Sequence, residues 1–169
     1  MHILITGAAG MIGRKLTARL VNDRALNGRS IEKFTLTDIG VPPRPEGFSG
    51  AVEAFAADIG DPATAPRAIA DRPDVIFHLA AVVSGEAELD FEKGTRVNLD
   101  GSRALLEAVR QCGESYRPRF VFTSSIAVFG APFPDAIPDE FHHTPLTSYG
   151  TQKAIVELLL ADYTRRGFV

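Results

Sequence analysis

The 169-residue chain contains one cysteine, no tryptophan, no excess of basic charge and no long apolar run. Cys112 has no partner for an internal disulfide, and it falls in an apolar helical stretch where cysteine is usually a small buried residue. The net charge of −3 provides no basic surface to neutralise the phosphates of a nucleic acid. No window holds the roughly 18 apolar residues of a transmembrane helix, and no secretory leader is recognisable. We therefore expect a cytoplasmic protein that binds neither nucleic acid nor membrane.

What is present is typical of one globular domain, with 45% hydrophobic and 23% charged residues. Short apolar, β-branched runs alternate with amphipathic segments. Strands are expected over residues 2–6, 33–38, 51–58, 74–81 and 119–125. Helices are expected over residues 11–22, from Asp61 onward, over 96–112 and over 148–165. This alternation predicts a Rossmann-type, doubly wound α/β fold, in which right-handed crossovers join parallel strands and helices cover both faces.

A glycine-rich loop follows the first expected strand. In "TGAAGMIG", Gly7, Gly10 and Gly13 have G-x-x-G-x-x-G spacing, and a helix is expected to begin near Met11 and Ile12. Glycine permits a tight turn and close backbone approach, and the unpaired N–H groups of a helix N-terminus can bind a pyrophosphate. The position of the loop after an N-terminal strand predicts a dinucleotide site.

Acidic residues end the next two expected strands. Asp38 lies 25 residues beyond Gly13, near the spacing of about 20 expected for an acid that binds the adenosine ribose. A carboxylate there repels a 2′-phosphate, which favours NAD over NADP, although a strand-end aspartate can also simply cap a turn. Asp58 and Ile59 end the third strand at the same sheet edge. They either contact the adenine ring or only form a turn in "DIGDP".

Tyr149 and Lys153 lie four residues apart near the start of the last expected helix, so both face one side. A tyrosine hydroxyl, with a pKa of about 10, is a poor base at neutral pH unless a nearby positive charge stabilises the phenolate. Lys153 is placed to provide that charge. Many helices carry such a pair by chance, so the surrounding motifs decide the interpretation. "TSSIAVFG" adds hydroxyl groups at the carboxyl edge of the sheet, where one can hydrogen-bond a reacting oxygen.

Together these motifs resemble the extended short-chain dehydrogenases, which include NAD-dependent sugar-nucleotide epimerases and dehydratases. The resemblance spans residues 1–169, as an NAD-binding domain. It implies that Tyr149 is the general acid or base, that Lys153 assists it and holds the nicotinamide ribose, and that Ser125, rather than Ser124, is the catalytic hydroxyl. Asn98 matches an asparagine beside the cofactor, although it can equally cap a helix. Residues of "HLAA" are also expected to line the cofactor site, namely Leu79, Ala80 and Ala81.

Within that family the chain is most similar to the branch of D-erythronate and related sugar-acid dehydrogenases. The resemblance implies a small-molecule substrate, a homodimer, and a C-terminal substrate-binding portion that is not among these residues. The leading hypothesis is oxidation of a sugar acid by hydride transfer to NAD. The alternatives are a nucleotide-sugar epimerase or dehydratase and a non-catalytic NAD-sensing module. Phe129 replaces a tyrosine common in the sugar-nucleotide enzymes, and residues 131–145 are expected to line the substrate cleft.

Three histidines, His78, His142 and His143, are further candidate site residues. His142 and His143 are adjacent, which points their side chains in different directions on an extended chain, and their spacing matches no zinc pattern. We therefore expect no metal site. His78 is expected to be a strand-end residue near the cofactor rather than a catalyst.

Overall fold

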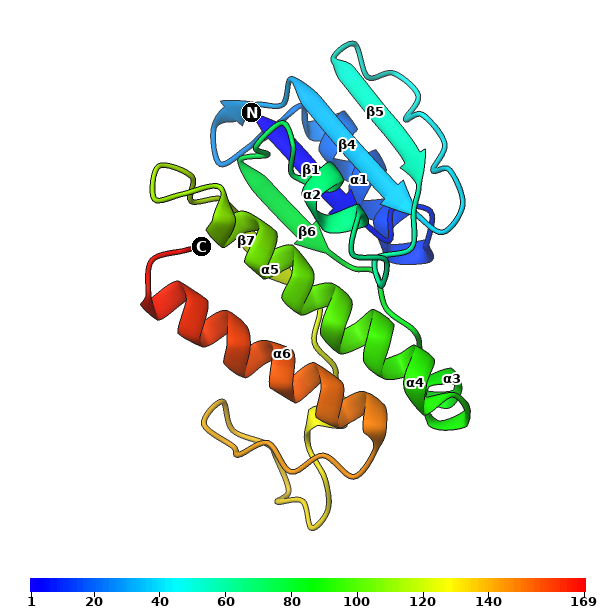
Figure 1. Ribbon diagram of the computed structural model, residues 1–169, viewed down its shortest axis with the longest axis vertical. Helices are drawn as coiled ribbons and strands as arrows, with labels where there is room; N and C mark the ends of the chain where they lie inside the picture. The colour runs from blue at the N-terminus through cyan, green and yellow to red at the C-terminus, as the bar shows by residue number, and fades with distance from the viewer.

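The computed structural model describes all 169 residues and contains a five-stranded parallel sheet with the order β5-β4-β1-β6-β7 (Figure 1). The strands are β1 (His2–Thr6), β4 (Lys33–Asp38), β5 (Ala51–Ala56), β6 (Val75–His78) and β7 (Arg119–Phe122). From β1 the chain winds outward through β4 to β5, then crosses to the other side of β1 to form β6 and β7. The winding direction reverses between β1 and β6, where doubly wound folds bind ligands at the carboxyl edge. The predicted fold class is confirmed.

Helices cover both faces of the sheet (Figure 1). The longer helices are α1 (Met11–Asp23), α5 (Gly101–Gln111) and α6 (Ser148–Arg165), and the short helical segments are α2 (Thr64–Ala68), α3 (Ser84–Leu89), α4 (Phe91–Gly94), the π-helical η1 (Thr95–Asp100) and the 3-10 turn η2 (Ile126–Val128). Helix α1 covers one face, α2 and α5 cover the other, and α6 packs beside α5. None of the helices combines the length and apolar composition needed to cross a membrane.

Strand β1 contributes to two apolar cores because successive side chains of a strand point to opposite faces. Ile3 and Ile5 pack in the core that includes Leu20 of α1, whereas Leu4 packs in the core that includes Leu105 of α5. Both faces of β1 are therefore buried, which explains why "HILIT" is apolar without alternation.

Several element boundaries differ from the sequence-based expectations. The helix expected over 96–112 is the end of a longer helical run that starts at α3 and includes η1. The helix expected from Asp61 begins three residues later, because the Asp61 side chain accepts a hydrogen bond from the Ala63 N–H (2.9 Å) and stabilises a turn. Strands β5, β6 and β7 end two or three residues before the predicted 58, 81 and 125, because the residues after them leave the ladder.

A hairpin of β2 (Ala25–Leu26) and β3 (Arg29–Ser30) was not predicted. Its two turn residues, Asn27 and Gly28, have φ values of +49° and +77°. An Asn-Gly pair is a strong hairpin signal, so the sequence contained the information.

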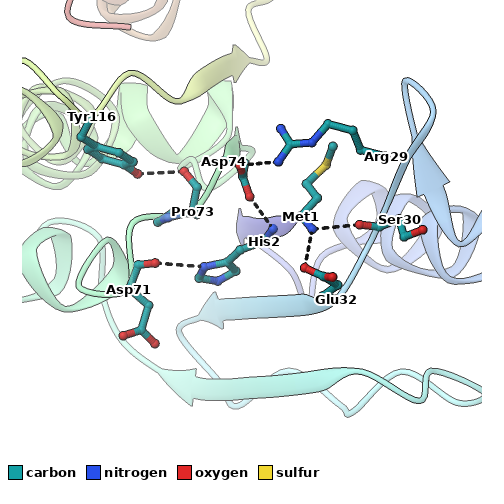
Figure 2. Close-up of polar contacts among 9 residues, drawn as sticks. All are labelled: Met1, His2, Arg29, Ser30, Glu32, Asp71, Pro73, Asp74 and Tyr116. Atoms are coloured by element: carbon teal, nitrogen blue, oxygen red, sulfur yellow. Dashed lines mark hydrogen bonds and ion pairs between the residues drawn. The ribbon is translucent and has the colours of Figure 1, made fainter.

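The amino edge of the sheet is fastened by polar contacts (Figure 2). The Asp74 carboxylate accepts hydrogen bonds from the His2 backbone N–H (2.7 Å) and from Arg29 (2.8 Å), and the buried Tyr116 hydroxyl donates to the Pro73 carbonyl (2.9 Å). The residues predicted to act on ligands lie at the opposite, carboxyl edge.

Candidate active site

A cavity of about 350 Å3 opens at the carboxyl edge, where β1, β4, β5 and β6 end. Its lining includes eight residues that the sequence predicts for the cofactor, namely Gly7, Gly10, Asp38, Asp58, Ile59, Leu79, Ala80 and Ala81. Thr6, Thr37, Val82 and Lys93 also line it and were not predicted. Thr6 and Thr37 carry the same signal as Asp38, a polar residue at a strand end. Lys93 comes from α4, and no sequence motif indicates that this helix lies at the cofactor site.

The glycine loop is packed too tightly for side chains. Gly7 has φ +73°, and a Cβ on it would lie 2.7 Å from the Ala80 nitrogen. A Cβ on Gly13 would lie 2.2 Å from the Gly7 carbonyl oxygen. Helix α1 begins at Met11 with no side-chain cap and no acid in its first turn, so the N–H groups of Met11, Ile12 and Gly13 have no intrahelical partner. This loop fits the pyrophosphate of a dinucleotide.

Asp38 fastens the next loop to the glycine loop. Its Oδ2 accepts a hydrogen bond from the Ala9 N–H (2.8 Å), and its Oδ1 accepts one from the Ile39 N–H (2.7 Å). Each carboxylate oxygen keeps a further lone pair. The Asp38 carboxylate therefore remains able to accept hydrogen bonds from ribose hydroxyls.

Asp58 is held by two donors at the end of β5. Burial opposes its ionisation, but hydrogen bonds from the Gly60 N–H (2.8 Å) and Arg96 (2.8 Å) outweigh burial and keep the pKa of Asp58 below its usual value. The following residue, Ile59, is buried at the cavity wall. Asp58 therefore carries a negative charge at neutral pH and serves as a hydrogen-bond acceptor at this end of the cavity.

Tyr149 and Lys153 lie in the first two turns of α6, whose predicted bounds are confirmed. The Lys153 Nζ donates a hydrogen bond to the Thr123 carbonyl (3.0 Å) and lies 5.6 Å from the centre of the Tyr149 ring. Lys153 is only 2% exposed, and burial lowers its pKa to about 8. At neutral pH the amine is still mostly charged, so the structure places a buried positive charge beside the tyrosine ring.

The turn η2 lies against the first turn of α6. A Cβ on Gly150 would lie 2.1 Å from the Ala127 carbonyl oxygen, so the close contact requires glycine. Ser125 caps η2 by accepting a hydrogen bond from the Ala127 N–H (3.2 Å). Ser124 is exposed and donates its hydroxyl proton to Glu157. The packing therefore brings Ser125 to the turn that carries Tyr149, whereas the Ser124 hydroxyl is already engaged.

Asn98 lies within η1 and does not cap a helix, so the capping alternative is wrong. Its Oδ1 accepts a hydrogen bond from the Val82 N–H (2.8 Å), and its Nδ2 donates to the Val82 carbonyl (3.0 Å) and to Gln152 (2.8 Å). With 1% of its surface exposed, Asn98 sits behind the cavity wall and holds the loop after β6.

The three candidate histidines lie in different environments. His143 pairs with Glu157 (3.1 Å), whereas His142 is exposed. The structure contains no group of three or more histidine, cysteine, aspartate or glutamate side chains placed to hold a metal ion. His78 ends β6 and is fully buried behind the cavity wall. Residues 131–145 form an irregular and largely exposed loop between η2 and α6 (Figure 1).

Comparison with known protein families agrees with this geometry. The model of the NAD dependent epimerase/dehydratase family matches residues 3–169. The chain belongs to this family. Its predicted cofactor, NAD, is the one that the family's description specifies. The resemblance inferred from the glycine loop and the tyrosine motif is thereby confirmed.

Individual proteins and solved structures also resemble the chain. A D-erythronate dehydrogenase from Cupriavidus necator is 48% identical over the whole chain, which spans 52% of that relative. A crystal structure described as a nucleoside-diphosphate-sugar epimerase from Agrobacterium tumefaciens is 67% identical, with a TM-score of 0.97 over 99% of this chain and 50% of that one. The UDP-glucose 4-epimerase of Thermus thermophilus in complex with NAD is 27% identical, with a TM-score of 0.79, covering 99% of this chain and 52% of that one. The chain thus spans about half the length of its relatives.

Proposed function

We propose that the protein is an NAD-dependent dehydrogenase that oxidises a secondary alcohol of a sugar acid such as D-erythronate. The 48% identity to a D-erythronate dehydrogenase supports the substrate class, and the Lys153 amine 5.6 Å from the centre of the Tyr149 ring supports the proposed proton transfer. In this proposal residues 1–169 hold NAD and the acid–base pair. The remaining substrate contacts come from the portion that the longer relatives have in addition.

NAD supplies the hydride acceptor when it is bound in the cavity. Tyr149 removes the hydroxyl proton of the substrate at its phenolic oxygen, and the nearby Lys153 ammonium stabilises the phenolate form. Ser125 hydrogen-bonds the reacting oxygen and orients it toward the tyrosine. Asp38 holds the adenosine ribose and disfavours a 2′-phosphate by charge repulsion.

The burial of Lys153 is the observation that carries this proposal. Removing an ammonium group from water is costly, and lysine is almost never fully buried unless it is paired. Here no carboxylate lies within ion-pairing distance of Lys153, and its contacts are the Thr123 carbonyl and the rings of Phe122 and Tyr149. A buried charge that costs folding free energy is expected at a catalytic site. A module that only senses NAD has no need of it.

A nucleotide-sugar epimerase is the second candidate, because the 67% identical structure is described as a nucleoside-diphosphate-sugar epimerase. An epimerase returns the hydride to the opposite face of the oxidised carbon, so reduced cofactor does not accumulate. A dehydrogenase releases it.

The full-length protein, given NAD and a panel of sugar acids, should accumulate NADH, which is followed by its absorbance. Isomerisation of a nucleotide sugar without NADH from any acid would contradict the proposed oxidation.

The role of Tyr149 is tested by Tyr149→Phe, which should lower turnover about 100-fold or more because proton transfer is lost, while NADH binding is retained. Tyr163→Phe is the matched control on the same helix, because the Tyr163 hydroxyl donates to Glu107 on α5. Unchanged turnover in Tyr149→Phe would remove the tyrosine from the mechanism.

A further inference from the structure

A continuous chain of buried hydrogen bonds runs behind the NAD cavity. The Thr6 hydroxyl contacts His78 Nδ1 (2.7 Å), His78 Nε2 contacts the Ser102 hydroxyl (2.9 Å), and Ser102 donates to the Asn98 carbonyl (2.6 Å). We call these four residues the buried polar chain. All of them are at most 1% exposed, and they connect β1 and β6 with η1 and α5. His78 lies at the centre of the buried polar chain and takes no part in the proposed proton transfer.

The hydrogen bonds of the buried polar chain can run in only one direction. A carbonyl oxygen cannot donate, so the single hydroxyl proton of Ser102 is used on the Asn98 carbonyl. Ser102 must then accept from His78, which places a proton on Nε2. Burial lowers the pKa of His78 to about 3, so the ring is neutral at physiological pH and its Nδ1 is bare. Thr6 must therefore donate to Nδ1.

The other tautomer is incompatible with these contacts. A proton on Nδ1 would leave the bare Nε2 facing a lone pair of Ser102 at 2.9 Å, since the Ser102 proton is engaged elsewhere. Buried polar groups without a partner are strongly disfavoured, and both side chains are at most 1% exposed.

The buried polar chain ends on the loop that forms one wall of the cavity. With its proton directed at His78, the Thr6 oxygen accepts a hydrogen bond from the Ala80 N–H (3.3 Å). Two residues further along the loop, the Asn98 side chain holds both backbone groups of Val82. A Cβ on Gly7 would lie 2.7 Å from the Ala80 nitrogen, so this wall is in backbone contact with the glycine loop.

We propose that His78 is a positioning residue of the NAD site, which acts as the neutral tautomer protonated on Nε2 and holds the 79–82 loop against the glycine loop through Thr6. The tautomer determines which way the Thr6 hydroxyl points. With that proton committed to His78, the Thr6 oxygen acts toward the loop only as an acceptor, for the Ala80 N–H. The proposal rests on the NAD site and not on the substrate, so it stands or falls independently of sugar-acid oxidation.

The tautomer is measured directly by long-range 1H–15N NMR of the full-length protein labelled with 15N-histidine. The signals of His78 are those that disappear in His78→Asn and shift in Ser102→Ala, and the second variant assigns them if the first does not fold. We expect a protonated Nε2 and a bare Nδ1, unchanged between about pH 5 and 8. A proton on Nδ1, or protonation of the ring within that range, would overturn the proposal.

The positioning role is measured by NADH binding. Ser102→Ala leaves the His78 Nε2–H without an acceptor and should weaken NADH binding about fivefold. Tyr116→Phe is the matched control, because it removes one buried hydroxyl that donates to the Pro73 carbonyl at the opposite edge of the sheet. Both variants should be less stable, and only Ser102→Ala should change the NADH dissociation constant. Equal NADH affinity in the two variants would show that the buried polar chain contributes to stability only, and it would overturn the positioning role of His78.

Discussion

Replacing Lys153 by methionine should stabilise the protein while abolishing its proposed activity. Burial lowers the pKa of Lys153 from 10.5 to about 8, which corresponds to about 3 kcal/mol of folding free energy lost by holding the charged amine in the site. Methionine fills a similar volume without that charge, but the variant loses the hydrogen bond to the Thr123 carbonyl, worth about 1 kcal/mol. We therefore expect Lys153→Met to be more stable by about 2 kcal/mol at pH 7.

The effect of Lys153 on stability depends on pH in a defined direction. Between about pH 8 and 10.5 the unfolded chain binds a proton on this lysine that the folded protein has released, so the stability of the parent protein rises with pH in this window. The advantage of Lys153→Met is therefore complete below about pH 8 and shrinks as the pH rises above it.

Urea unfolding of the full-length proteins, followed by circular dichroism at a series of pH values, measures this difference. Lys15→Met is the control, because Lys15 is exposed on α1 and forms no ion pair, and its replacement should change stability by less than about 0.5 kcal/mol. If Lys153→Met is no more stable than the parent at pH 7, or if its advantage does not change with pH, the assignment of Lys153 as a buried, destabilising charge is wrong.

Two further predictions concern the cofactor site. Gly13→Ala should destabilise the fold by roughly 1–3 kcal/mol and weaken NADH binding, because its Cβ would lie 2.2 Å from the Gly7 carbonyl oxygen. Thermal unfolding measures the first effect and NADH titration the second. A variant with parental stability and parental affinity would refute the packing argument. Asp38→Asn removes the carboxylate that we propose binds the adenosine ribose, and it should lower the KM ratio of NADP to NAD about tenfold. An unchanged ratio would mean that Asp38 does not face the 2′ position.

The parts of the site that are local in sequence could be predicted from it. Residues 148–165 form a helix with the predicted bounds because the segment is apolar in pattern and free of proline, and the Thr147 cap directly precedes it. The glycine loop was recognisable for the same reason. Asp38 could be placed because parallel strands bring their carboxyl ends to one edge.

What escaped prediction depends on contacts between distant segments. Lys93 reaches the cavity from α4, which packs against α3, η1 and α6, and no local sequence pattern predicts those contacts. Asn98 was recognised only through family resemblance, and its partners, Val82 and Gln152, lie 16 and 54 residues away. The buried polar chain could not be foreseen either, because a strand-end histidine looks the same in sequence whether it faces a ligand or a serine.

The number of residues in the π-helical segment η1 is as important to the fold as their identity. Val97 lines the cavity and Asn98 holds the Val82 loop before the segment ends, whereas Leu105, Leu106 and Val109 of α5 bury themselves after it. Each residue of an α-helix turns the chain by about 100°. Deleting one residue from 95–100 would remove only one side chain. It would still rotate α5 relative to Asn98 by about 100°, so that either the apolar face of α5 would turn away from the sheet or Asn98 would turn away from the Val82 loop. At this point in the chain, spacing carries information that no single side chain does.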